Sequence, residues 1–197
     1  MNSNWFKLLM KATKIQYGKN LKLRGIPVIF NQSGAKLTIG DDVTINSSFL
    51  SNLVGLYQRT IIITRTPEAV IHIGNHVGIS GATIYARTSV TIGDNTNIGG
   101  NAKILDNDFH PLEIEARNAD IKEKIGTRPI VIGKNCFIGC NSLILKGTVL
   151  GDGCVVGAGA VVSGTFEENS VIAGNPARVI KKLKSDCSDL KYAESFS

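Results

Sequence analysis

Hydrophobic and polar residues between positions 132 and 162 repeat with a period of six. A large aliphatic side chain stands at every sixth position, in the order Ile132, Ile138, Ile144, Leu150, Val156 and Val162. The next residue is Gly or Ser in five of the six cases, and a small residue follows at the fourth position: Cys136, Ser142, Thr148, Cys154 and Ala160. A helix requires apolar spacings of three and four, and a simple strand requires alternation. The strict period of six therefore predicts stacked β-coils made of short strands and turns.

The same step occurs earlier in the chain, beginning near Leu37. Its aliphatic positions there are Ile39, Ile45, Ile73, Ile79, Ile92, Ile98 and Ile104. Residues 51–60 fit no coil and are predicted to form a loop, and a step of thirteen instead of twelve predicts one inserted residue near positions 86–89. The longest interruption, at 105–131, is charged and has no period. Because an excursion of this length is unusual in a compact repeat, we expect a functional loop.

The two ends of the chain lack the repeat. Residues 2–17 place Trp5 and Leu8 on one face at helical spacing, with lysines elsewhere, which predicts a short helix within 1–20. We interpret this helix as a cap on the open end of the coil. A membrane-surface anchor is the alternative, since Trp and Phe opposite Lys also suit a lipid interface. The predicted organisation is a capping helix (1–20), one β-domain (21–184, with the loop 105–131) and a tail (185–197).

Composition narrows the function classes. The 197 residues suit a single domain, and the net charge of +6 agrees with an anionic ligand. Apart from a cluster at 181–184, the basic residues are scattered, which argues against a nucleic-acid-binding protein. No apolar run resembles a signal sequence or a membrane span, so we expect a cytoplasmic protein. The four cysteines form no Cys-x-x-Cys pair, and we predict neither a disulfide nor a metal site.

The phrase Asp106-Asn107-Asp108-Phe109-His110-Pro111, followed by Arg117, opens the long loop. Together with the repeat over residues 37–184, it resembles the hexapeptide-repeat acyltransferases. The likeness is to the branch that acetylates sugars, which includes galactoside, maltose, nodulation and capsule or O-antigen acetyltransferases. The resemblance implies an all-β fold, a left-handed parallel β-helix, whose handedness the period alone does not predict. It also implies a homotrimer with coenzyme A bound between subunits.

By this resemblance, His110 is the general base. An alcohol that attacks a thioester must lose its proton, and an imidazole that titrates near neutral pH can accept that proton. Five other polar residues are candidates for orienting the imidazole or binding the acceptor sugar: Asp106, Asp108, Arg117, Ser80 and Asn101.

The cofactor positions also follow from the resemblance. Acetyl-CoA would contact Gly139, Cys140, Ala158, Ser163, Gly164, Arg178 and Lys181, the last two beside its phosphates. A backbone N–H near Gly139 is the expected donor to the oxyanion. Several positions depart from the family pattern: Phe137 replaces a common Trp, Cys140 a common Ser, Gly164 a common Lys, and Glu167-Glu168 a frequent Pro-Pro.

The sequence thus predicts an acetyl-CoA-dependent O-acetyltransferase that acts, without a metal, on a saccharide hydroxyl of a surface polysaccharide, its precursor or a small sugar. N-acetylation of an amino sugar, free or nucleotide-linked, stays open, since a histidine base serves both reactions. A γ-carbonic-anhydrase-like zinc enzyme would need His72, His76 and His110 as ligands, and the spacing of the first two fits poorly. A non-catalytic scaffold would need neither the loop histidine nor the basic pair.

Overall fold

The structure, a computed structural model, describes Met10 and residues 13–184. Short strands in this part of the chain form three sheets, called A, B and C here, and each coil adds one strand to each sheet. Sheet A comprises β1 (Gln16–Tyr17), β4 (Lys36–Ile39), β7 (Val70–Ile73), β10 (Ser89–Ile92), β13 (Ile130–Ile132), β16 (Val149–Leu150) and β19 (Thr165–Phe166). Sheet B comprises β2 (Lys22–Gly25), β5 (Thr44–Ser47), β8 (Gly78–Ser80), β11 (Asn97–Ile98), β14 (Phe137–Ile138), β17 (Val155–Val156), β20 (Ser170–Gly174) and β21 (Ala177–Lys182). Sheet C comprises β3 (Val28–Asn31), β6 (Ile61–Thr64), β9 (Thr83–Ala86), β12 (Lys103–Leu105), β15 (Leu143–Leu145) and β18 (Val161–Val162).

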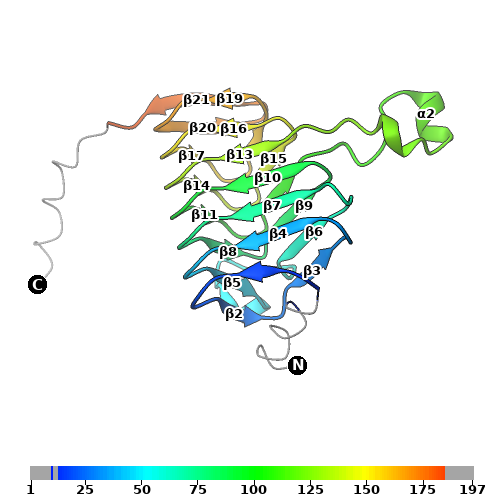
Figure 1. The fold of residues 1–197 in the computed structure, drawn as a ribbon. Helices are drawn as coiled ribbons and strands as arrows, with labels where there is room; N and C mark the ends of the chain where they lie inside the picture. Colours follow the sequence, from blue (N-terminus) through cyan, green and yellow to red (C-terminus); the bar gives the residue numbers. More distant parts are fainter. Residues whose placement is uncertain (1–9, 11–12, 185–197) are drawn as a thin grey trace, which may run out of the picture.

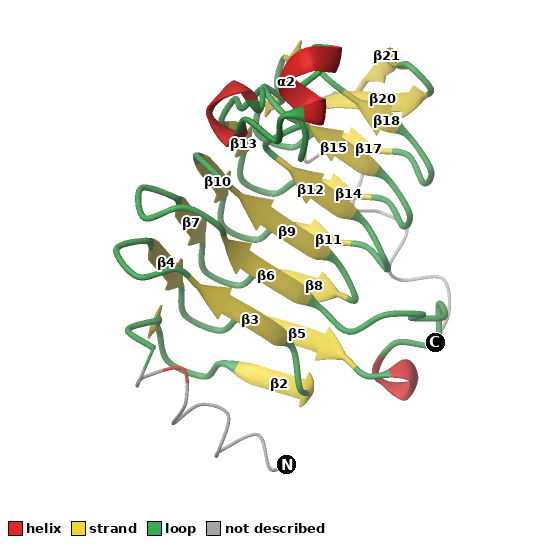
Figure 2. Ribbon diagram, turned by 90° about the vertical axis from the view of Figure 1, so that its right-hand side faces the viewer, coloured by secondary structure: helices red, strands yellow, loops and turns green. Residues whose placement is uncertain are grey.

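The three sheets wind into a left-handed parallel β-helix. Neighbouring strands are parallel except β20 and β21, which pair antiparallel at the end of sheet B. Figure 2 shows sheet C facing the viewer, with sheet A on its left and sheet B on its right. In Figure 1 the coils rise from bottom to top while the front strands β4, β7 and β10 run from right to left, which makes the winding left-handed. The expected fold class is confirmed.

The core consists of the aliphatic side chains that the six-residue period predicts. Since side chains alternate along a strand, one residue of each two-residue strand points inward. In sheet B, Ile98, Ile138 and Val156 are register partners, and each is at most 2% exposed. The small column is also internal, with Cys136 and Cys154 fully buried. Each buried aliphatic side chain stabilises the coil by about 1.5–3 kcal/mol.

The coil extends further at both ends than the repeat indicates. Its first strand begins at Gln16, not near Leu37, so residues 16–17 are strand and not part of a helix. Apart from Met10 and residues 13–20, the predicted capping helix lies outside the described residues, as does the predicted tail. After Val162, where the period fails, Phe166 and Ile172 still fill the core of sheets A and B after steps of four and six.

Both predicted loops are confirmed. The first excursion, which we call the 48–60 loop, leaves β5 with a 3-10 turn, η1 (Phe49–Ser51), and returns at β6. The second separates β12 from β13, contains α2 (Ile114–Asn118) and η2 (Lys122–Lys124), and projects from the coil in Figure 1. The inserted residue lies at the Arg87–Thr88 turn between β9 and β10. No helix of the described residues is long and apolar enough to cross a membrane.

Candidate active site

Turns from sheet B to sheet C form one edge of the coil, the B/C corner, and turns from sheet C to sheet A form the C/A corner. The long loop leaves the coil at the C/A corner, and Asp106 lies at its base with no exposed surface. Its carboxylate accepts hydrogen bonds from the backbone N–H groups of Arg87 and Thr88 at 2.6–3.0 Å and from the Thr88 hydroxyl at 2.8 Å. Asn107 donates a further bond at 3.0 Å. Asp106 therefore holds the inserted turn, and its oxygens are not free to bind a sugar as predicted.

Asp108 ties the loop to the coil. Its carboxylate pairs with the Lys146 ammonium, which follows β15, and its N–H donates to the Gly126 carbonyl at 3.0 Å. The next residue, Phe109, has a φ of +63° and packs its ring against Tyr85 at a centroid distance of 4.9 Å. These contacts fix the backbone on the N-terminal side of His110.

His110 lies exposed at the mouth of the loop. Its N–H donates to the Asp108 carbonyl at 2.7 Å, while its imidazole has no hydrogen bond or ion pair within residues 13–184. Neither aspartate forms a hydrogen bond or ion pair with the ring, so no carboxylate of the described residues orients it. Arg117 is exposed, and its guanidinium donates to the carbonyls of Pro111 at 3.3 Å and Leu112 at 2.8 Å. It braces the loop that presents the imidazole.

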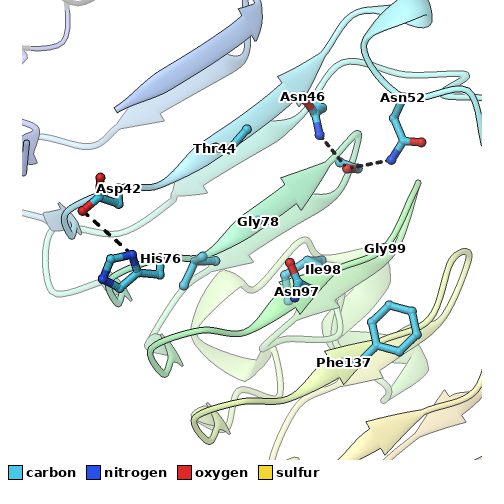
Figure 3. A pocket seen from close by; sticks show the side chains of 12 residues that line it. Asp42, Thr44, Asn46, Asn52, His76, Gly78, Asn97, Ile98, Gly99 and Phe137 are labelled. Atoms are coloured by element: carbon cyan, nitrogen blue, oxygen red, sulfur yellow. Dashed lines mark hydrogen bonds and ion pairs between the residues drawn. The ribbon is translucent and has the colours of Figure 1, made fainter. Parts of the chain in front are cut away.

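Ser80 and Asn101, the other predicted sugar-binding residues, lie at the B/C corner. The Ser80 hydroxyl accepts bonds from Asn46 and Asn52 at 3.0 Å each, and Figure 3 shows both amides directed at it. They line a groove of about 460 Å³ on sheet B, together with the exposed ring of Phe137. Asn101 faces the 48–60 loop instead, because its amide bonds the N–H of Tyr57 and the carbonyl of Gly55. Ser80 is therefore a groove residue and Asn101 a loop anchor.

The predicted thioester positions lie at the same corner. The Gly139 N–H is occupied by the Val156 carbonyl at 2.8 Å, so it is not the free oxyanion donor. The backbone N–H groups of Cys140 and Ala158, on successive coils, have no acceptor among the described residues. Gly139 approaches Ala158 so closely that a Cβ would lie 2.5 Å from the Ala158 nitrogen. Two neighbouring free amides therefore line this edge.

The remaining cofactor candidates are spread along the upper coils. Ser163 and Gly164 form the C/A turn between β18 and β19, and Arg178 and Lys181 lie on β21, both exposed. The Arg178 guanidinium donates to the Ala177 carbonyl at 2.8 Å. The Lys181 backbone pairs with β20, while its ammonium has no hydrogen bond or ion pair in the described part of the chain. This placement leaves Lys181 and most of the Arg178 guanidinium open to an anion.

One chain does not bring the whole candidate site together. His110 lies at the C/A corner, and the free amides of Cys140 and Ala158 lie at the B/C corner. These corners are the two ends of sheet C, separated by a strand and its turn, roughly 15–20 Å.

The three histidines that a zinc enzyme would need are also apart. His72 bonds the Thr38 hydroxyl at 2.8 Å on sheet A, and His76 lies 3.8 Å from Asp42 at a turn from sheet A to sheet B.

Sequence reasoning missed the residues that support the loop. Lys146 partners Asp108 from 38 positions away, and Tyr85 supports Phe109 from the neighbouring coil. The phase of the repeat could have indicated Lys146, because it places this residue at the end of a sheet C strand. The sequence does not show that the long loop brings Asp108 back to that strand end.

Comparisons with known proteins agree with this architecture. A family profile described as "Hexapeptide repeat of succinyl-transferase" matches residues 89–104 and 129–163. Galactoside O-acetyltransferase of Escherichia coli is 39% identical over 114 residues, which cover 57% of this chain and 54% of that protein. The chain spans about half the length of the curated relatives it matches. In its repeated coils and in these matches, the chain is similar to the hexapeptide-repeat acyltransferases.

Solved structures have the same fold. A variant of AntD, an N-acyltransferase from Bacillus cereus solved with dTDP and coenzyme A, has a TM-score of 0.67 at 24% identity, covering 90% of this chain and 89% of that one. The hexapeptide-repeat-containing acetyltransferase VCA0836 from Vibrio cholerae has a TM-score of 0.58 at 21% identity, covering 93% and 82%. At such identities the likeness concerns the coil architecture alone.

Proposed function

We propose that this protein is an acetyl-CoA-dependent O-acetyltransferase whose acceptor is a saccharide hydroxyl and whose general base is His110. The observation that carries the proposal is the exposed imidazole, free of partners within residues 13–184, on a backbone fixed by Asp108 and Phe109. A base held in this way accelerates proton removal by about 10²–10⁴-fold. The galactoside acetyltransferase relative favours oxygen over nitrogen as the acceptor atom.

The reaction needs no covalent enzyme intermediate. His110 takes the proton of the sugar hydroxyl as its oxygen attacks the thioester carbonyl, and a tetrahedral oxyanion forms. The free N–H groups of Cys140 and Ala158 are the candidate donors to the oxyanion or the pantetheine amides. Collapse breaks the carbon–sulfur bond, and the imidazolium returns its proton to the leaving thiolate. The products are the acetyl ester and free coenzyme A.

The cofactor would extend from these amides toward β21. Because Gly139 has no side chain, successive coils approach closely at the edge where the pantetheine would lie. Ser163 and Gly164, in the C/A turn, would lie near the nucleotide. Arg178 and Lys181 supply fixed positive charge for the phosphates. Neither Arg178 nor Lys181 has a carboxylate partner among the described residues, which supports this path for the acyl donor.

We also propose a homotrimer, which the separation of the two corners supports. Because His110 and the free amides are at opposite ends of sheet C, a site that uses both would be completed by a neighbouring copy. Aliphatic side chains on the outer face of sheet C suit such contact, with half-buried residues at Ile61, Leu105, Leu143 and Leu145. We propose that the protein acts in the cytoplasm on a surface-polysaccharide precursor or a small saccharide.

Calorimetric titration with acetyl-CoA and with dephospho-CoA tests the donor without knowledge of the acceptor. We expect one site per chain and weaker binding of dephospho-CoA, which lacks the 3′-phosphate. The His110→Ala variant should bind acetyl-CoA normally and lose about 10²–10⁴-fold in transfer rate to an accepted sugar. The matched control is His72→Ala, which changes a histidine on sheet A outside the candidate site. This variant should keep full activity. Absence of acetyl-CoA binding at saturating protein contradicts the proposal.

A further inference from the structure

A second cavity, of about 400 Å³, lies at the C/A corner next to the long loop, and we call it the C/A pocket. Three basic side chains and two aromatic rings dominate its lining: Arg65, Arg87, Lys122, Tyr85 and Phe109. Phe109 is the residue directly before His110, so the pocket adjoins the segment that carries the candidate base. The catalytic proposal assigns no role to any of the three cations.

Arg65 and Arg87 come from successive coils at the same corner. Each follows a register partner, Thr64 in β6 or Ala86 in β9, so their backbones are about 4.8 Å apart. Three hydrogen bonds hold this corner: Arg65 N–H to the Ala86 carbonyl at 2.8 Å, the Thr66 hydroxyl to the Arg87 carbonyl at 2.7 Å, and Arg87 N–H to Asp106 at 2.8 Å. The two side chains therefore leave from fixed, adjacent positions.

No carboxylate of the described residues pairs with the guanidinium of Arg65 or Arg87. Neither guanidinium has a hydrogen bond or ion pair in the described chain, and like charges directly opposite each other on paired strands are destabilising. The Asp106 carboxylate is buried and accepts hydrogen bonds from backbone N–H groups, and the Asp120 carboxylate pairs with Lys122. A bound anion would relieve the repulsion, and two adjacent guanidinium groups suit the oxygens of a diphosphate.

The surface beside the arginines is aromatic and apolar. Phe109 is 40% exposed and tilts at 57° against Tyr85. A neighbouring cavity of about 390 Å³ is lined by Phe30, Ile63, Arg65 and Tyr85, so it shares two residues with the C/A pocket. An anion attached to a flat ring fits this combination better than an inorganic anion does.

We propose that the C/A pocket binds the diphosphate of a nucleotide-linked sugar, with Arg65 and Arg87 on the phosphates and the Tyr85–Phe109 pair against the base or sugar ring. This inference rests on the proposed function and gives its acceptor a chemical class. A sugar attached to a diphosphate at this corner would lie next to the loop segment that carries His110. The transferred acetyl group would then enter the sugar before the nucleotide is released.

Calorimetric titration of the full chain with uridine diphosphate, uridine and inorganic pyrophosphate tests the pocket. Saturating coenzyme A is included, so that the proposed cofactor site is already occupied. We expect uridine diphosphate to bind at one site per chain, uridine to bind at least about tenfold more weakly, and pyrophosphate to fall between them. Equal affinity for uridine and uridine diphosphate would overturn the role of the arginines, and failure of uridine diphosphate to bind would overturn the site.

Charge variants locate the binding. Arg65→Gln and Arg87→Gln should each weaken uridine diphosphate binding by about tenfold or more, since each removes charge-assisted hydrogen bonds. Arg24→Gln, on sheet B in the first coil, is the matched control and should bind normally. Equal affinity in all three variants refutes the assignment. Circular dichroism checks that each variant folds.

Acetyl-CoA binding separates this inference from the proposed function. A chain that binds acetyl-CoA but not uridine diphosphate keeps the acetyltransferase proposal and loses the nucleotide-linked acceptor. A chain that binds uridine diphosphate through Arg65 and Arg87 but not acetyl-CoA loses the catalytic proposal and keeps the pocket.

Discussion

The Lys146 ammonium pairs with the Asp108 carboxylate, two residues before His110 and 38 residues away in sequence. Both side chains are mostly buried, at 27% and 21% exposure. The pair joins the end of a sheet C strand to the mouth of the loop, so the position of the candidate base depends on the coil below it.

Lys146→Met is expected to leave a half-buried carboxylate without its partner. The free energy of unfolding should fall by about 1–3 kcal/mol, measured by urea denaturation. Transfer activity should fall while the affinity for acetyl-CoA is unchanged, because only the loop loses its anchor. Lys134→Met removes a surface pair with Asp94 at 3.7 Å and should leave the free energy of unfolding nearly unchanged. Equal effects of the two substitutions would refute the anchoring role.

Asp106→Asn tests a structural role against sugar binding. The amide cannot accept all the bonds from Arg87, Thr88 and Asn107, so we expect a loss of about 2–3 kcal/mol in the free energy of unfolding. The KM for an accepted sugar should not change. A raised sugar KM without loss of stability would instead return Asp106 to the acceptor site.

Thiol labelling tests whether coenzyme A binds at the B/C corner beside Cys140. Burial raises the pKa of Cys136 to about 11 and raises that of Cys154 as well, so both remain protonated thiols at pH 8. Because the reactive thiolate forms only as the pH approaches a raised pKa, their labelling should be slow and increase above pH 8. Cys140 lies at a turn and is half-buried, so it should react first and be protected by coenzyme A. Peptide mapping separates it from Cys187; lack of protection would count against the proposed cofactor path.

Mixing two inactive variants tests whether neighbouring copies share a site. His110→Ala removes the base, and Ala158→Trp should block the cofactor edge at the other corner. Random mixed trimers made by unfolding and refolding equal amounts should recover about one quarter of the sites, because each site needs one intact corner from each of two copies. Sedimentation of each variant and of the mixture should show a trimer. A mixture as inactive as its parents would place the whole site within one chain.

Much of the fold could be predicted from the sequence because the repeat encodes it locally. The step from Ile138 to Ile144 and Leu150 assigns an inward residue to each sheet in turn, and the burial of all three confirms it. The first coil was missed because turns such as Gly25-Ile26-Pro27 break the period between Leu21 and Ile29. At the other end, Phe166 follows Val162 after four residues and still enters the core.

The candidate site was predictable only in part. His110 was placed correctly at the mouth of a long loop, because an uninterrupted motif marks it. The structural role of Asp106 was not predictable, since its bonding partners Arg87 and Thr88 belong to the preceding coil. Nor does the motif reveal that the Gly139 N–H is already occupied by the next coil.

The sequence by itself determined the coil, the inward face of each strand and the loop that carries His110, because these depend on side-chain size at a fixed period along the chain. Only the tertiary structure decided which side chains meet. The Arg65 and Arg87 pair, and the separation of His110 from the Cys140 amide, depend on how the coils stack. Contacts of this kind join residues far apart in sequence, and the period does not specify the paths of the loops between them.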